Sequence, residues 1–127
     1  MSKTYLTLSA LMAGIVAVHV FMGGPQYAVP FMLELSTPDL RAMSQVLWHA
    51  VTVALILVAL AYLWLGFQNN RALFVFTSVL QLGWAMLFLY YGVTEMGELA
   101  TQPQWVLFLG FPAGACWAEG RRNSSQL

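Results

Sequence analysis

The sequence predicts an all-α integral membrane protein: a four-helix bundle with up-down-up-down topology. Of its 127 residues, 60% are hydrophobic and only 8% are charged, whereas a soluble domain carries roughly 25% charged residues. So few charges cannot cover a water-facing surface. The chain also contains four apolar segments, and a helix of about 20 residues crosses a hydrocarbon core of about 30 Å. Helices are expected because an open sheet edge leaves backbone groups unsatisfied in lipid.

The first two helices are expected at about residues 5–23 and 38–67. Gly23-Gly24-Pro25 should end the first, because glycine favours the C-terminal cap and proline cannot continue a helix. Pro38 suits the first position of the second helix, and Thr37 is a candidate N-cap. The apolar stretch 27–35 between these helices is too short to span, so we expect it to lie in the membrane interface or over the bundle mouth.

The third and fourth helices are expected at about residues 71–92 and 103–118. The polar turn 68–70 is short, so the helices on either side of it should be antiparallel neighbours. Gly110 and Gly114 have the GxxxG spacing, which permits close helix approach. The polar tail, residues 121–127, is expected to be disordered.

Charge sets the expected orientation. Four of the five basic residues fall on one side of a four-span chain, and only Arg41 falls on the other. The positive-inside rule therefore places both termini in the cytoplasm, with a bacterial inner membrane as the expected setting. The net charge is zero and no basic patch suits nucleic acid. A single cysteine, Cys116, excludes an intramolecular disulfide.

The two histidines of the chain, His19 and His49, are the candidate functional residues. Each lies in an apolar segment near the expected outer surface, and an ionisable residue inside a membrane is a functional hypothesis by default. Gln45, His49 and Thr52 share one helical stripe that is expected to face inward. The candidate pocket residues are His19, Gly23, Gln45, His49, Thr52 and Gln81.

Four roles are open for the two histidines. They could be axial ligands of haem b, with Gly23 and Gly24 leaving room for the macrocycle, although only Arg41 is near enough for a propionate. They could bind a transition metal with loop carboxylates. They could form a proton-sensitive switch, or simply make interhelical hydrogen bonds. The loop carboxylates are Glu34, Asp39, Glu95 and Glu98.

The chain has no recognisable catalytic motif, so enzymatic activity is left open. No serine, threonine or cysteine stands with a histidine and a carboxylate in a hydrolase pattern. Small multidrug-resistance transporters also have four short helices, but they carry a carboxylate in the first helix. The stretch 11–18 has none here.

His19-x3-Gly23-Gly24, then Pro30, then Trp48-His49-x2-Thr52 together resemble a family of small bacterial four-helix inner-membrane proteins with no assigned activity. The resemblance covers the first two helices, and the other two match in hydropathy. It implies the bundle fold and makes the two histidines and the double glycine the positions to test.

Two functions follow as expectations. The first is a small membrane protein with an outward-side pocket at His19 and His49 that holds a metal ion or haem. The alternative is a non-catalytic accessory or structural subunit of a larger membrane complex. The expected partners are the lipid bilayer, and a larger membrane complex or a second copy of the chain.

Overall fold

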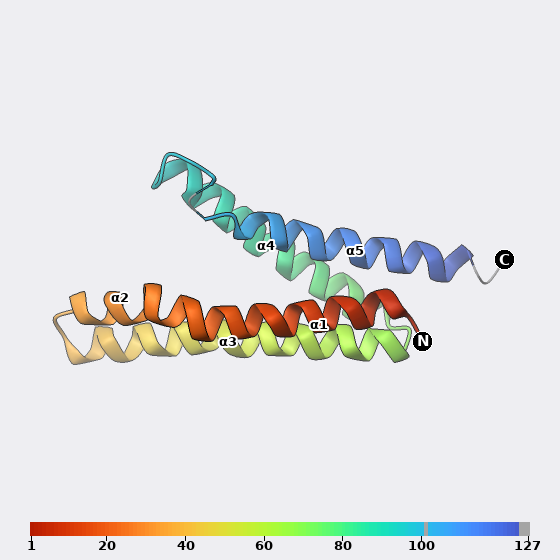
Figure 1. The fold of residues 1–127 in the computed structure, drawn as a ribbon, viewed down its shortest axis with the longest axis horizontal. Coiled ribbons are helices and arrows are strands. Elements are labelled where there is room, and N and C mark those ends of the chain that lie inside the picture. The colour runs from red at the N-terminus through yellow and green to blue at the C-terminus, as the bar shows by residue number, and fades with distance from the viewer. Residues whose placement is uncertain (101, 125–127) are drawn as a thin grey trace. The chain divides into compact units, whose positions relative to one another are not determined.

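The computed structural model of the protein describes residues 1–100 and 102–124, and almost all of them are helical. Along the chain, α1 (Lys3–Val18), the π-helix η1 (His19–Ala28) and α2 (Val29–Glu34) follow one another without a break. They are followed by α3 (Pro38–Phe67), α4 (Arg71–Thr94) and α5 (Gln104–Ser124) (Figure 1). The prediction of an all-α protein is confirmed, with four continuous helical segments in the described part of the chain.

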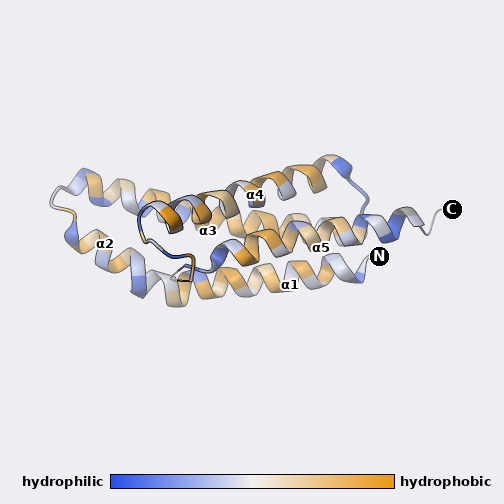
Figure 2. Ribbon diagram, turned by 90° about the horizontal axis from the view of Figure 1, so that it is seen from above, coloured by the Kyte–Doolittle hydropathy of each residue, from blue (hydrophilic) through white to orange (hydrophobic). Residues whose placement is uncertain are grey.

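Three of these segments are long and apolar enough to cross a membrane: Lys3–Glu34, Pro38–Phe67 and Arg71–Thr94. Apolar residues predominate in them, while the most hydrophilic residues lie in the turns, at the helix ends and in the stretch between α1 and α2 (Figure 2). The protein is therefore a helical membrane protein. The fourth span expected at 103–118, the up-down-up-down topology and the side on which the termini lie stay predictions.

The prediction that Gly23-Gly24-Pro25 ends the first helix is wrong. The chain continues through this stretch as the π-helix η1, and Pro25 lies inside it. Proline has no N–H to donate, and in an α-helix its ring clashes with the carbonyl four residues earlier. In η1 the hydrogen bonds reach back one residue further, as in the bond from the Val29 N–H to the Gly24 carbonyl. The wider turn accommodates the proline without ending the helix.

Two further helix boundaries differ from those expected from the sequence. In both cases the helix continues for as long as its backbone hydrogen bonds can form. The stretch 27–35, expected to connect the first two helices in the membrane interface or over the bundle mouth, is helical as far as Glu34, and its place in the membrane stays a prediction. Residues 121–124, expected to be disordered, form the end of α5. The rest of the expected tail, 125–127, lies outside the described residues.

One compact unit comprises residues 9–62. In it, the part of α1 after Leu8 and η1 lie antiparallel to α3. The Ser9 hydroxyl donates to the Ala59 carbonyl across 2.9 Å, and ten residues further on His19 meets Thr52. As the position advances along the first segment, its partner on α3 moves back toward the start of that helix. The two segments are therefore antiparallel, and the unit is a helical hairpin.

The other compact unit comprises, of the described residues, 1–8, 63–100 and 102–124. Here α4 and α5 pack together, with the ring of Phe108 in contact with Trp84 and Phe88 at centroid distances of 5.1 and 5.8 Å. The Asn70 side chain caps α4 by accepting from the Leu73 N–H at 3.0 Å.

The start of α1 belongs to this unit and packs on α5. A Cβ on Gly114 would lie 3.0 Å from a methyl group of Leu8, so the glycine permits this close approach, as the GxxxG spacing predicts for one of its two positions. A Cβ on Gly110 would meet nothing within 4 Å. Gly110 is therefore not used for close packing in this unit.

Candidate functional site at His19

His19 begins η1 and is half-buried against α3. Its imidazole stacks on the indole of Trp48, with ring centroids 4.0 Å apart and 15° between the ring planes. Its Nε2 lies 3.1 Å from the Oγ1 of Thr52, one helical turn after Trp48. The ring is therefore held by one polar and one aromatic contact, both from α3.

The hydrogen bonds around Thr52 determine the proton position on His19. The Thr52 hydroxyl donates its single hydrogen to the Trp48 carbonyl, 3.1 Å away. Its oxygen can then only accept from His19. Nε2 of His19 therefore carries the hydrogen, and in the neutral ring Nδ1 is the nitrogen with the lone pair.

Gly23 is the second residue of η1 that Trp48 contacts, after His19. A Cβ at this position would lie 3.2 Å from one edge carbon of the indole, closer than side chains normally pack. His19 and Gly23 are one turn apart on the helical segment. The space that Gly23 leaves open is therefore filled by Trp48, whereas the sequence suggested it could receive a macrocycle.

The predicted inward stripe of α3 is wrong by about one residue. Gln45 and His49 are both exposed, and so is Ile56, one turn after Thr52. Trp48 and Thr52 are half-buried and Ser44 is buried. The packed stripe of α3 within its hairpin contains Ser44, Trp48, Thr52, Leu55 and Val58. Trp48 takes the inward position, where its ring stacks on His19 and its edge lies against Gly23, and its neighbour His49 is turned outward.

On the first helical segment, four residues at helical spacing form one packed stripe. Met12 is fully buried, and Ile15, His19 and Gly23 are half-buried. Of the predicted pocket residues, the hairpin brings together His19, Gly23 and Thr52, and it leaves Gln45 and His49 outside this contact.

Gln81 belongs to the other unit. It is fully buried on α4, and its Nε2 donates to the Thr77 carbonyl one turn earlier at 2.9 Å. The neighbouring Thr77 hydroxyl is itself bonded to the Leu73 carbonyl at 2.9 Å. The hydrogens of these polar side chains are therefore donated to backbone carbonyls of their own helix, as those of polar residues in membrane helices often are.

The arrangement at His19 is better suited to holding two helices together than to binding a cofactor. Haem ligation through Nε2 would break the bond to Thr52, and the ring face already lies against Trp48. A metal ion would find only Nδ1. Within the described residues, no three His, Cys, Asp or Glu side chains are grouped as metal ligands would be.

Trp48 is the functional residue that the sequence analysis missed. The sequence alone assigned it no role, yet its ring contacts both His19 and Gly23. The signal was present in the spacing: Trp48 and Thr52 are four apart, and so are His19 and Gly23. Two such pairs on consecutive helices predict that one turn of each helix meets the other.

Comparison of the chain with protein-family models, curated proteins and solved structures gave no match. The fold and the His19 contacts therefore define the class, which is a helical membrane protein with three candidate spans. Its most specific feature is an interhelical contact between η1 and α3.

Proposed function

We propose that the protein is a non-catalytic accessory subunit that packs against another integral membrane protein through one face of α3. The observation that carries this proposal is the exposure of two polar side chains, Gln45 and His49, one turn apart on an apolar membrane-spanning helix. In this proposal they hydrogen-bond to the partner protein.

The depth of His49 supports contact with a partner protein rather than with water. His49 precedes the end of α3 at Phe67 by 18 residues, which is about 27 Å at 1.5 Å per residue. With Phe67 at one surface, the imidazole lies just inside a hydrocarbon core of about 30 Å. A polar side chain at this depth is costly against acyl chains and is normally paired with protein.

The opposite flank of the packed stripe of α3 is apolar. Leu47 is 61% exposed and lies on the other side of Trp48 from His49, because each residue turns the helix by about 100°. This flank suits lipid. A helix with a protein neighbour on one side is expected to be polar on the flank that faces the protein and apolar on the flank that faces lipid.

His19 differs from the exposed His49, and this difference favours the accessory role over a cofactor pocket. His19 has its partner within the chain, in Thr52, and its ring is covered by Trp48. A pocket shared by both histidines would need His19 to leave these contacts and His49 to turn from its exposed position. The accessory role requires neither change.

The test is isolation of the tagged protein from its native membranes in a mild detergent. We expect it to migrate in a complex larger than its own 14.1 kDa, and the double variant Gln45→Leu/His49→Leu to lose that complex while retaining its helix content. Leu47→Ala is the matched control, since it alters the other flank at the same depth, and it should retain the complex. An unchanged complex in the double variant contradicts the proposal.

A further inference from the structure

A basic pocket lies at the beginning of α1, in the unit formed by residues 1–8 and 63–124. It is lined by Ser2, Lys3, Thr4, Ala118, Arg121 and Arg122, among others. Two helix ends meet here. The first turn of α1 offers backbone N–H groups that have no acceptor within the helix, and the last turn of α5 brings two arginines.

Arg122 is already committed within the protein. Its Nη1 lies 3.1 Å from the Oε1 of Glu119, its other terminal nitrogen donates to the Leu65 carbonyl, and its guanidinium lies over the ring of Tyr5 at 4.8 Å. Glu119 also accepts from the Tyr5 hydroxyl at 2.8 Å. The charges of Arg122 and Glu119 therefore cancel in a fixed network.

Lys3 and Arg121 keep their charge uncompensated. Both are exposed, and neither forms an ion pair with any side chain in residues 1–100 or 102–124. The first turn of α1 contains no acidic residue to balance the positive end of the helix dipole. The pocket therefore presents two free cations and a helix N-terminus, which is a combination that binds an oxyanion such as phosphate.

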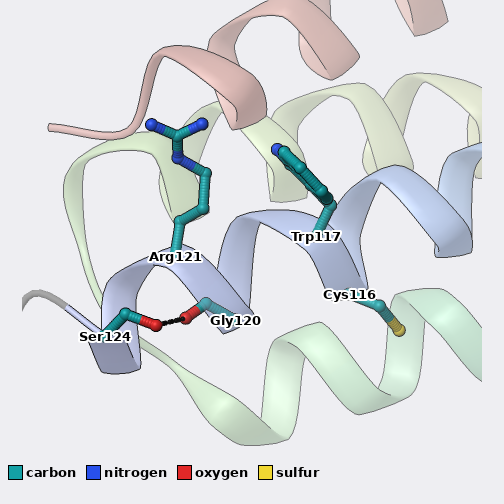
Figure 3. A pocket seen from close by; sticks show the side chains of 5 residues that line it. All are labelled: Cys116, Trp117, Gly120, Arg121 and Ser124. Carbon is teal, nitrogen blue, oxygen red and sulfur yellow. Dashed lines mark hydrogen bonds between the residues drawn. The ribbon is translucent and has the colours of Figure 1, made fainter.

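An apolar groove continues from this pocket along α5, and Arg121 borders both. The groove is lined by Cys116, Trp117, Gly120, Arg121 and Ser124 (Figure 3). In Figure 3, Trp117 and Arg121 project to one side of the helix and Cys116 to another. Gly120 lies between them without a side chain, and a Cβ there would meet nothing within 4 Å. The guanidinium of Arg121 lies 5.9 Å from the Trp117 ring.

We propose that this end of the protein binds one anionic phospholipid, with the headgroup phosphate between Lys3 and Arg121 and an acyl chain along the groove beside Trp117. A phosphate without an acyl chain would use the pocket and leave the groove empty. Basic pockets at the ends of membrane helices bind anionic headgroups in this way. An exposed tryptophan, 63% accessible here, is typical of the level at which headgroups lie. The proposal rests on the membrane location and on α5 lying along the acyl chains, and it does not depend on the accessory role.

The test is native mass spectrometry of the delipidated protein in detergent, titrated with phosphatidylglycerol or with phosphatidylcholine of the same acyl chains. We expect one phosphatidylglycerol to bind more tightly than phosphatidylcholine, and the binding to weaken as salt is raised. Lys3→Gln/Arg121→Gln should lower the affinity for phosphatidylglycerol by roughly 30-fold, since each basic residue near an anionic lipid contributes about a 5-fold factor.

Two controls keep the interpretation specific. Arg71→Gln removes an exposed basic residue outside the pocket and should leave the affinity unchanged, whereas the charge-preserving variant Lys3→Arg/Arg121→Lys should retain most of it. Inorganic phosphate at millimolar concentration should not displace the lipid, and its displacing the lipid would show a free-anion site and overturn the lipid assignment. Equal affinity of the wild-type protein for the two lipids would overturn the proposal without any variant.

Discussion

The indole of Trp48 lies against the imidazole of His19 at 4.0 Å between centroids, and the same imidazole is bonded to Thr52 one turn further along α3. Gly23 completes the contact by leaving space for the indole edge. The two histidine-containing motifs of the sequence thus meet as one turn of η1 against one turn of α3. This contact, and the outward position of His49 that follows from it, leads to the predictions below.

The first prediction concerns the energy of the His19–Thr52 bond. In a double-mutant cycle of His19→Phe and Thr52→Val, the two residues should show a coupling free energy of about 0.5–2 kcal/mol, because they share one interhelical bond. The measurement is unfolding of the protein in detergent micelles. Replacing Thr52→Val by Thr7→Val provides the control, since the Thr7 hydroxyl is bonded to the Lys3 carbonyl of its own helix. Additive effects of His19→Phe and Thr52→Val would mean that the bond contributes nothing to stability.

The second prediction compares the adjacent glycines. Gly23→Val should destabilise the hairpin by about 1–3 kcal/mol, because the new side chain meets Trp48 in a packed contact. Gly24→Ala should be neutral or stabilising by up to about 1 kcal/mol, because its Cβ meets nothing within 4 Å and alanine favours a helix. Thermal unfolding followed by circular dichroism checks both. Equal losses at the two positions would place the indole elsewhere.

The third prediction is the visible spectrum of the purified protein. Nε2 of His19 is bonded to Thr52 and one ring face is covered by Trp48, so we expect a preparation with no Soret band and no stoichiometric transition metal. Absorption spectroscopy and elemental analysis of one sample suffice. A Soret band that disappears in both His19→Ala and His49→Ala would restore the haem hypothesis.

The fourth prediction concerns the start of α4. Asn70→Ala should lower stability by about 1 kcal/mol, because the Leu73 N–H loses the side-chain acceptor that lies at 3.0 Å. Asn69→Ala, in the same turn, should have a smaller effect. Unfolding measurements in detergent that rank the two variants in the reverse order would show that the cap does not form.

Much of the helix pattern could be predicted from local chemistry. The ends of α3 at Pro38 and Phe67 and the start of α4 at Arg71 agree with the sequence, because a proline at the first position and a polar turn each act through a few neighbouring residues. The effect of Pro25 could not be predicted in the same way. Whether a proline ends a helix or widens it into a π-turn depends on the packing of the surrounding segment, and here the indole of Trp48 packs beside that turn.

Part of the candidate site could be predicted from the sequence. His19, Gly23 and Thr52 do come together, as their spacing indicated. The outward turn of His49 was missed because the polar spacing of Gln45, His49 and Thr52 was given more weight than the apolar surface of Trp48. One residue changes the direction of a side chain by about 100°, so an error of one residue in the stripe moves a histidine from the inside of the hairpin to the outside.

Photo-crosslinking in native membranes tests the central claim most directly, with a benzophenone side chain introduced at one position of α3 at a time. Positions 45 and 49 should give an adduct of higher mass than the monomer, because Gln45 and His49 face the partner protein. Position 47, equally shallow but on the lipid flank, should give none. An adduct from position 47 and none from 45 or 49 would contradict the account.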